Sequence, residues 1–69
     1  MKSLSARKII KILEKNNFTL TRQKGSHVIF KHLDGIMVPV PLHAKTKPLP
    51  IGTFLAIVRQ SKIPKQEWK

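Results

Sequence analysis

The chain has 69 residues, enough for a single domain spanning residues 1–69 with a thin hydrophobic core. Fourteen Lys and Arg residues against three Asp and Glu residues give a net charge of +11, and this excess predicts an anionic partner, most commonly nucleic acid. The absence of cysteine excludes a disulfide framework and fits a reducing compartment, so we expect a cytoplasmic protein. No apolar run approaches the roughly 20 residues that span a bilayer, and the three histidines lack zinc-type spacing, so we expect no membrane partner, metal or cofactor.

The first predicted element is a helix from Ser5 to about Asn16. Ser5 is a suitable N-cap, and Asn16 and Asn17 can supply a left-handed exit, a position that usually calls for glycine. Apolar residues at three-to-four-residue spacing form one stripe that can pack on a sheet: Ala6, Ile9, Ile10 and Leu13.

Three strands are predicted to follow. Residues 18–22 alternate apolar and polar side chains, as a half-buried strand does, and residues 24–26 then turn the chain. A second strand covers His27 to His32, a hairpin loop covers residues 33–35, and a third strand covers residues 36–41. Pro39 and Pro41 cannot donate to a ladder, which predicts that the third strand lies at an edge of the sheet.

The length of the hairpin loop decides which way His27 points. A two-residue Asp-Gly turn would put His27 on the same face as the apolar side chains of the third strand. A three-residue loop, with Gly35 in the left-handed conformation, pairs His32 with Ile36 and separates apolar from cationic side chains more cleanly. We therefore expect His27 on the face away from the core and His32 on the core side.

A basic, proline-rich segment, residues 42–50, connects the sheet to a second helix. This helix is predicted to begin near Gly52 and Thr53, with Thr53 as its cap, and to stop before Pro64. Trp68 is expected to cover the core. The helical spacing also predicts core positions at Ile51, Phe54, Leu55, Ile57 and Val58.

The predicted fold is therefore α+β in the order α-β-β-β-α, with both helices on one face of a three-stranded antiparallel sheet. This arrangement leaves the other face and one set of loops available for function. The residues that stand out there are His27 and the turn before it, Lys24, Gly25 and Ser26.

RNA cleavage without a metal needs a group that accepts a proton from the attacking hydroxyl and groups that neutralise the charge building on the phosphate. Histidine suits the first task because its usual pKa is near neutral pH, whereas cationic side chains and turn amides suit the second. From the pattern alone His27 is a weak candidate, since a single histidine at a strand start is usually an ordinary surface residue. No serine or cysteine triad, carboxylate pair or phosphate-binding glycine loop is evident.

Residues 22–32 (RQKGSHVIFKH), followed by Asp34-Gly35 and by residues 40–43 (VPLH), resemble the HicA family, the small mRNA-cleaving toxins of bacterial toxin–antitoxin pairs. Residues 52–60 resemble the closing helix of that family. The resemblance implies a fold similar to double-stranded-RNA-binding domains, metal-independent ribonuclease activity, and neutralisation by an acidic HicB-like antitoxin. The family's catalytic histidine falls on His27.

This resemblance makes an mRNA endonuclease the leading hypothesis, with His27 as general acid or base. Lys24 and the Gly25 and Ser26 amides would hold phosphate. Further RNA contacts are expected from Arg22, Lys31, His43, Lys45 and Lys47. The main alternative is a non-catalytic RNA-binding module that grips A-form RNA by shape and charge. Direct DNA binding is not expected, because the second helix is mostly apolar.

Overall fold

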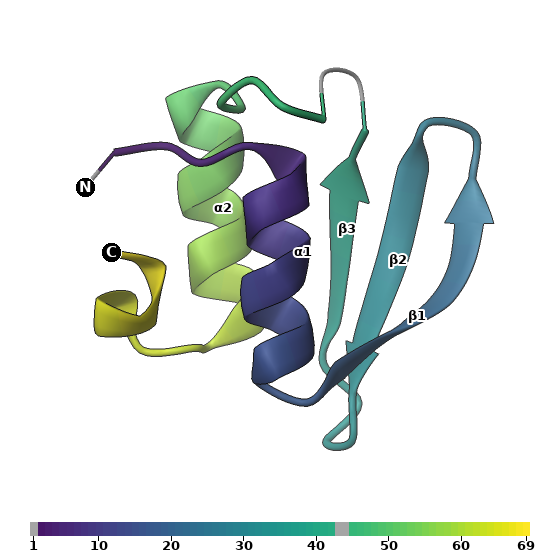
Figure 1. Ribbon diagram of the computed structural model, residues 1–69. Helices are drawn as coiled ribbons and strands as arrows, with labels where there is room; N and C mark the ends of the chain where they lie inside the picture. Colours follow the sequence, from purple (N-terminus) through teal and green to yellow (C-terminus); the bar gives the residue numbers. More distant parts are fainter. Residues whose placement is uncertain (1, 43–44) are drawn as a thin grey trace.

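The computed structural model describes residues 2–42 and 45–69. Figure 1 shows two helices on one side of a three-stranded antiparallel sheet, which confirms the predicted α-β-β-β-α fold. The elements in chain order are α1 (Ala6–Lys15), β1 (Phe18–Lys24), β2 (His27–His32), β3 (Met37–Pro41), α2 (Ile51–Ser61) and a final 3₁₀ turn, η1 (Lys65–Trp68).

Helix α1 begins and ends as predicted. The Ser5 hydroxyl accepts a hydrogen bond from the Lys8 amide at 3.3 Å, which satisfies one of the donors left over at a helix start. At the other end the Asn16 side chain donates to the Ile12 carbonyl at 2.8 Å, and Asn17 leaves the helix with φ of +70°. Asparagine tolerates this left-handed conformation better than other non-glycine residues do.

The hairpin between β2 and β3 has the three-residue loop expected from the sequence. The His32 amide donates to the Ile36 carbonyl at 2.9 Å, and Gly35 has φ of +93°. This register places apolar side chains of all three strands on the face that the helices cover: Phe18, Val28, Phe30, Val38 and Val40.

The core lies between that face and the two helices, and Trp68 closes one end of it. Trp68 is 1% exposed, and its ring meets Phe54 edge-on, with 5.8 Å between the centroids. This confirms the role expected for Trp68. Its indole nitrogen has no hydrogen-bond partner among the described residues. The helices add Ala6, Ile9, Leu13, Ile57 and Val58 to the core, and Leu49 and Ile63, which lie just before and after α2, complete it.

Helix α2 differs from the prediction in its start and in its buried face. It begins at Ile51, and Pro50 rather than Thr53 occupies the N-cap position, without a capping side-chain hydrogen bond. Pro50 has φ of −52° and ψ of 139°, and its carbonyl accepts the first helical hydrogen bond from the Phe54 amide at 3.0 Å. Ile51 and Leu55 are 50% and 44% exposed, so the prediction that they belong to the core was wrong. The stripe that packs on the sheet is rotated from theirs and consists of Phe54, Ile57, Val58 and Ser61.

Strand β1 is longer and more exposed than predicted. It continues past Arg22 to Lys24, and Phe18 is its only buried residue. Leu20 faces the same side as the core residue Phe30, yet it is 55% exposed. This exposure agrees with the course of β1, which in Figure 1 lies farthest from α2 and bends away from α1 in its later part.

Strand β3 lies at an edge of the sheet, as its prolines predicted. Pro39 and Pro41 pair with Ile29 and His27 of β2. The bond between His32 and Ile36 sets the alternation along this ladder, and it puts both prolines at positions that exchange no hydrogen bonds with β2. Their missing amides therefore cost the sheet nothing.

Candidate functional site

His27 is the first residue of β2, and its side chain is exposed. Side chains alternate between the two faces of a strand. Because Val28 and Phe30 are buried against the helices, His27 lies on the opposite face, which no helix covers. The register of the hairpin therefore places His27 on the face predicted from the sequence, away from the core.

A tight turn brings Lys24 next to His27. The two residues pair across β1 and β2, and only Gly25 and Ser26 separate them in the chain. Gly25 has φ of +62°, as expected at the first position of a type II′ hairpin turn. Directly opposite residues in an antiparallel pair have Cβ atoms about 5 Å apart, so the Lys24 and His27 side chains are neighbours.

The carbonyls of this turn are held by neighbouring groups. The Leu42 amide donates to the Ser26 carbonyl at 2.7 Å, and the Gln23 side chain donates to the Gly25 carbonyl at 3.1 Å. Among the described residues, the Gly25 and Ser26 amides donate no backbone hydrogen bond. The turn is thus fixed through its acceptors, while its donors remain available to an anion.

A β-bulge at Thr21 decides where Arg22 and Lys24 point. Leu20 pairs with Phe30 and Arg22 with Ile29, so Thr21 is an extra residue in β1. In a regular strand, Arg22 and Lys24 would share the face of Leu20. The bulge reverses the alternation after Leu20 and turns both cations to the face of His27, as bulges near functional sites often do. The Thr21 hydroxyl donates to the Ile29 carbonyl at 3.0 Å and ties the bulge to β2.

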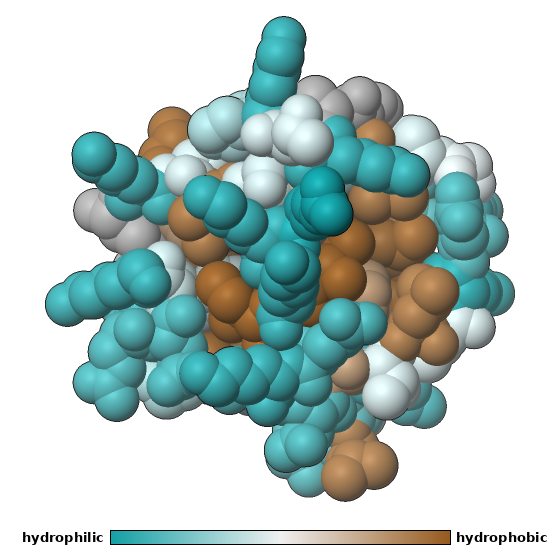
Figure 2. Space-filling model, viewed as in Figure 1, coloured by the Kyte–Doolittle hydropathy of each residue, from teal (hydrophilic) through white to brown (hydrophobic). Residues whose placement is uncertain are grey.

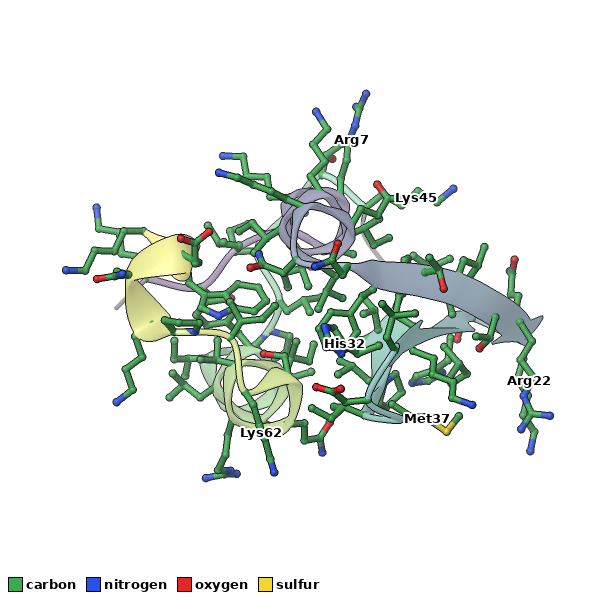
Figure 3. The ribbon with its side chains drawn as sticks, turned by 90° about the horizontal axis from the view of Figure 1, so that it is seen from below. Arg7, Arg22, His32, Met37, Lys45 and Lys62 are labelled. Atoms are coloured by element: carbon green, nitrogen blue, oxygen red, sulfur yellow. The ribbon has the colours of Figure 1, made fainter. Side chains whose placement is uncertain are left out.

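The face of the sheet away from the helices therefore has three rungs. Lys24, His27 and Pro41 form the rung nearest the turn, and Arg22, Ile29 and Pro39 form the next. Thr19, Lys31 and Met37 form the third. Figure 3 shows Arg22 and Met37 projecting from the same side of the strands. We call the four exposed titratable side chains of this surface the basic face: Arg22, Lys24, His27 and Lys31.

The other cations predicted to bind RNA lie elsewhere. The Lys45 carbonyl accepts a hydrogen bond from the Arg7 amide at 3.2 Å, at the start of α1. Figure 3 shows Arg7 and Lys45 on the side of β1 opposite Arg22. Lys47 is exposed beside Pro48, which forms a bridge with Ser5. His43 lies outside the described residues. The structure therefore gathers four of the predicted side chains on the basic face and puts Lys45 across the sheet from them.

His32 has structural contacts. It is half-buried, and its ring centroid lies 5.1 Å from that of Phe18. Its Nδ1 accepts a hydrogen bond from the Asp34 amide at 3.1 Å, and the Asp34 carboxylate lies 3.5 Å from the same atom. These contacts fix the hairpin loop, as expected for a histidine on the core side.

Clusters of metal ligands and helices that could span a membrane are absent from residues 2–42 and 45–69. In that part of the chain, no three His, Asp or Glu side chains lie together in a way that could hold a metal ion. None of its helices has the length and apolar character needed to cross a bilayer.

Residues 6–63 match the protein family described as the HicA toxin of bacterial toxin–antitoxin systems. The match begins at the first residue of α1 and includes all three strands and α2. It therefore covers the bulge, the turn and His27. No match was found among the curated proteins with which the chain was compared.

Proposed function

This chain belongs to the HicA toxin family of bacterial toxin–antitoxin systems, and we propose that it is an endoribonuclease that cleaves messenger RNA with His27 as the general acid or base. Toxins of this family are known to cleave RNA. The observation that carries the proposal for this chain is the bulge at Thr21, because it turns two cations toward the only exposed histidine of the described residues.

In the proposed reaction, the His27 imidazole takes the proton from the hydroxyl that attacks the phosphorus. As the bond to the leaving oxygen breaks, the imidazolium formed in this way returns a proton, directly or through water, to that oxygen. A histidine suits both transfers because the usual pKa of its side chain is near neutral pH. Such general acid–base catalysis typically contributes about 10²- to 10⁴-fold in rate.

Lys24 and the turn amides are proposed to stabilise the charge that develops on the phosphate. The Lys24 ammonium is on the neighbouring strand, directly across from His27. The Gly25 and Ser26 amides sit between the two residues in the chain and can donate to phosphate oxygens. One phosphate can therefore contact the turn and the imidazole together.

Arg22 and Lys31 are proposed to bind the part of the RNA that runs from the reacting phosphate along the sheet, away from the turn. Arg22 lies one rung from His27 and Lys31 lies two rungs away, on the same face. Contacts of this kind bind the phosphate backbone without reading its sequence, and they weaken as salt rises because bound counterions are no longer released to a dilute solution.

The family also implies an antitoxin partner. We propose that this partner is an acidic, HicB-like protein. With a net charge of +11, the toxin repels itself, and an acidic protein would relieve that repulsion as RNA does.

The test is RNA cleavage by the His27→Gln variant in the presence of EDTA. Wild type and variant are purified by the same route and incubated with end-labelled single-stranded RNA. We expect the variant to lose at least about 100-fold in cleavage rate, because glutamine cannot transfer the proton. Its circular dichroism should match that of the wild type, since His27 is exposed and lies outside the buried core.

The same assay separates the enzyme from a non-catalytic RNA binder. A wild-type chain that retards labelled RNA on a gel and yields no fragments would be a binding module, for which the charge alone is sufficient. Cleavage that persists unchanged in His27→Gln would mean that another residue, or a contaminating nuclease, performs the reaction.

A further inference from the structure

A groove lies between α1 and the β1–β2 hairpin, on the side of the sheet opposite the basic face. Helix α1 packs on the start of β1, and beyond it the hairpin bends away. The cavity left between them has a volume of about 510 Å³. Its floor is apolar and is formed by Ile10, Leu20, Val28, Phe30 and Leu42.

The exposure of Leu20 is the feature that needs an explanation. Leu20 faces the same side as Phe30, which is 2% exposed, yet Leu20 itself is 55% exposed. Leaving a large apolar side chain in water gives up the free energy that burial would supply. In Figure 2 hydrophobic surface is visible between α1 and the strands, with hydrophilic side chains around it. An apolar patch with a polar rim is typical of a protein-binding site.

The rim of the groove is mainly cationic. Arg7 and Lys11 come from α1, and Lys45 comes from the segment that follows β3. One acid, Glu14, also lines the groove. Figure 3 shows Arg7 and Lys45 projecting on the same side of the molecule. A ligand that fits here presents apolar groups to the floor and carboxylates to the rim.

We propose that this groove binds an acidic amphipathic segment of the antitoxin. The inference rests on the toxin–antitoxin part of the proposed function and adds to it the surface that the antitoxin uses. Apolar side chains of the segment cover Leu20 and Ile10, and its carboxylates meet Arg7, Lys11 and Lys45. The charge of the groove rim and the apolar character of its floor together select a protein segment of this composition.

A protein segment suits this groove better than RNA does. The floor is mostly aliphatic, and its one aromatic ring, Phe30, is almost wholly buried, so no ring face is presented for a base to stack on. The groove also lies across the sheet from His27, so RNA at the basic face does not need it. Leu20 and Lys11 of the groove can therefore be changed without altering the residues proposed to cleave RNA.

The first experiment measures the affinity of the full chain for its cognate antitoxin, produced from the neighbouring reading frame, by calorimetry. Leu20→Ser should weaken binding at least about tenfold, the effect expected for an apolar anchor in a groove. The matched control is Leu33→Ser, which makes the same change at a side chain that is 90% exposed and lies in the β2–β3 loop, far from the groove. Equal affinities for the two variants would overturn the proposal.

A second pair of variants tests the rim. Lys11→Gln should weaken antitoxin binding more than Lys65→Gln does, and should reduce its dependence on salt. Both remove one exposed lysine charge, but only Lys11 lines the groove. A larger effect from Lys65→Gln would contradict the assignment of the groove.

Cleavage assays on the same variants separate this inference from the proposed function. Without antitoxin, Leu20→Ser should cleave RNA at the wild-type rate, whereas His27→Gln should bind antitoxin with wild-type affinity and fail to cleave. If wild type does not cleave RNA, the proposed activity fails and the binding experiment still decides the groove. Nuclear magnetic resonance shifts at Ile10 and Leu42 on adding a 2′-O-methyl RNA, with none on adding antitoxin, would assign the groove to RNA instead.

Discussion

Lys24 and Lys31 carry the same charge on the same face of the sheet, but they lie at different distances from His27. Lys24 is directly across from His27, with about 5 Å between the Cβ atoms. Lys31 is four residues further along β2, which at about 3.3 Å per residue corresponds to roughly 13 Å. We therefore predict that Lys24→Gln lowers kcat and that Lys31→Gln weakens only RNA binding.

The expected size of each effect follows from Coulomb's law. A phosphate charge about 6 Å from an ammonium group is stabilised by about 0.7 kcal/mol at a dielectric constant of 80 and by about 2.8 kcal/mol at 20. These energies correspond to roughly 3-fold and 100-fold in rate. Lys24 is exposed, so we expect about tenfold. Lys31 lies beyond the Debye length of about 10 Å at 0.1 M salt, so its loss should change kcat by less than about twofold.

The assay is single-turnover cleavage of a labelled single-stranded RNA in 0.1 M salt, with kcat and KM obtained from the dependence on protein concentration. Lys31→Gln should raise KM and reduce the slope of log affinity against log salt by about 0.7, the value for one phosphate contact in single strands. Lys65→Gln is the control for a change of charge off the basic face. Equal losses of kcat in Lys24→Gln and Lys31→Gln would refute the assignment of Lys24 to the reacting phosphate.

Three further predictions separate structural from functional roles. His32→Ala should lower the free energy of unfolding by roughly 1 kcal/mol in denaturant titrations, because the ring that contacts Phe18 and its hydrogen bond are lost. RNA cleavage should persist in this variant, whereas His27→Gln should lose it. Gly25→Ala and Gly35→Ala should each lower the free energy of unfolding by roughly 1–2 kcal/mol. The loss comes from backbone strain alone, because a Cβ at either site meets no atom within 4 Å. Only Gly25→Ala should also slow RNA cleavage. Trp68→Ala should lower the free energy of unfolding by about 3–5 kcal/mol and the melting temperature, measured by circular dichroism, by at least about 12 °C. A smaller shift would mean that the core packs well without the Trp68 side chain.

Structural features that depend on a few neighbouring residues could be predicted from the sequence. Ser5 caps α1 because its own hydroxyl reaches the amide three residues later, and Asn17 leaves the helix because its side chain tolerates a positive φ. The three-residue loop followed from the requirement that one face of each strand be apolar. The same requirement put His27 on the uncovered face, so the position of the candidate base followed from the sequence as well.

The bulge at Thr21 did not follow, because it depends on the pairing of two strands. Phe18 and His32 pair at one end of the β1–β2 ladder and Lys24 and His27 at the other, so seven residues of β1 face six of β2. This difference of one residue indicates a bulge only when the residue pairs at both ends of the ladder are known. Strict alternation from Phe18 would have turned Arg22 and Lys24 toward the core side.

The placement of Lys45 and the rotation of α2 depended on tertiary packing. Lys45 follows the sheet in a segment without its own periodicity, and its backbone bond to Arg7 decides which side it occupies. In α2, two apolar stripes of similar strength compete, and contact with the sheet selects the one that includes Phe54 rather than Ile51. Propensity within the helix cannot distinguish them.

The prolines of β3 have a consequence for assembly. Pro39 and Pro41 stand where an amide would point away from the sheet, so along this margin Met37 is the one residue of β3 that can still donate outward. A fourth strand from another molecule needs donors and acceptors in alternation, and this margin offers almost none of the donors. At the opposite edge of the sheet, the bulge at Thr21 in β1 interrupts regular pairing with a strand of another molecule. Neither edge of the sheet therefore offers an unbroken strand to which a strand of another molecule could pair. This limits edge-to-edge polymerisation into fibres.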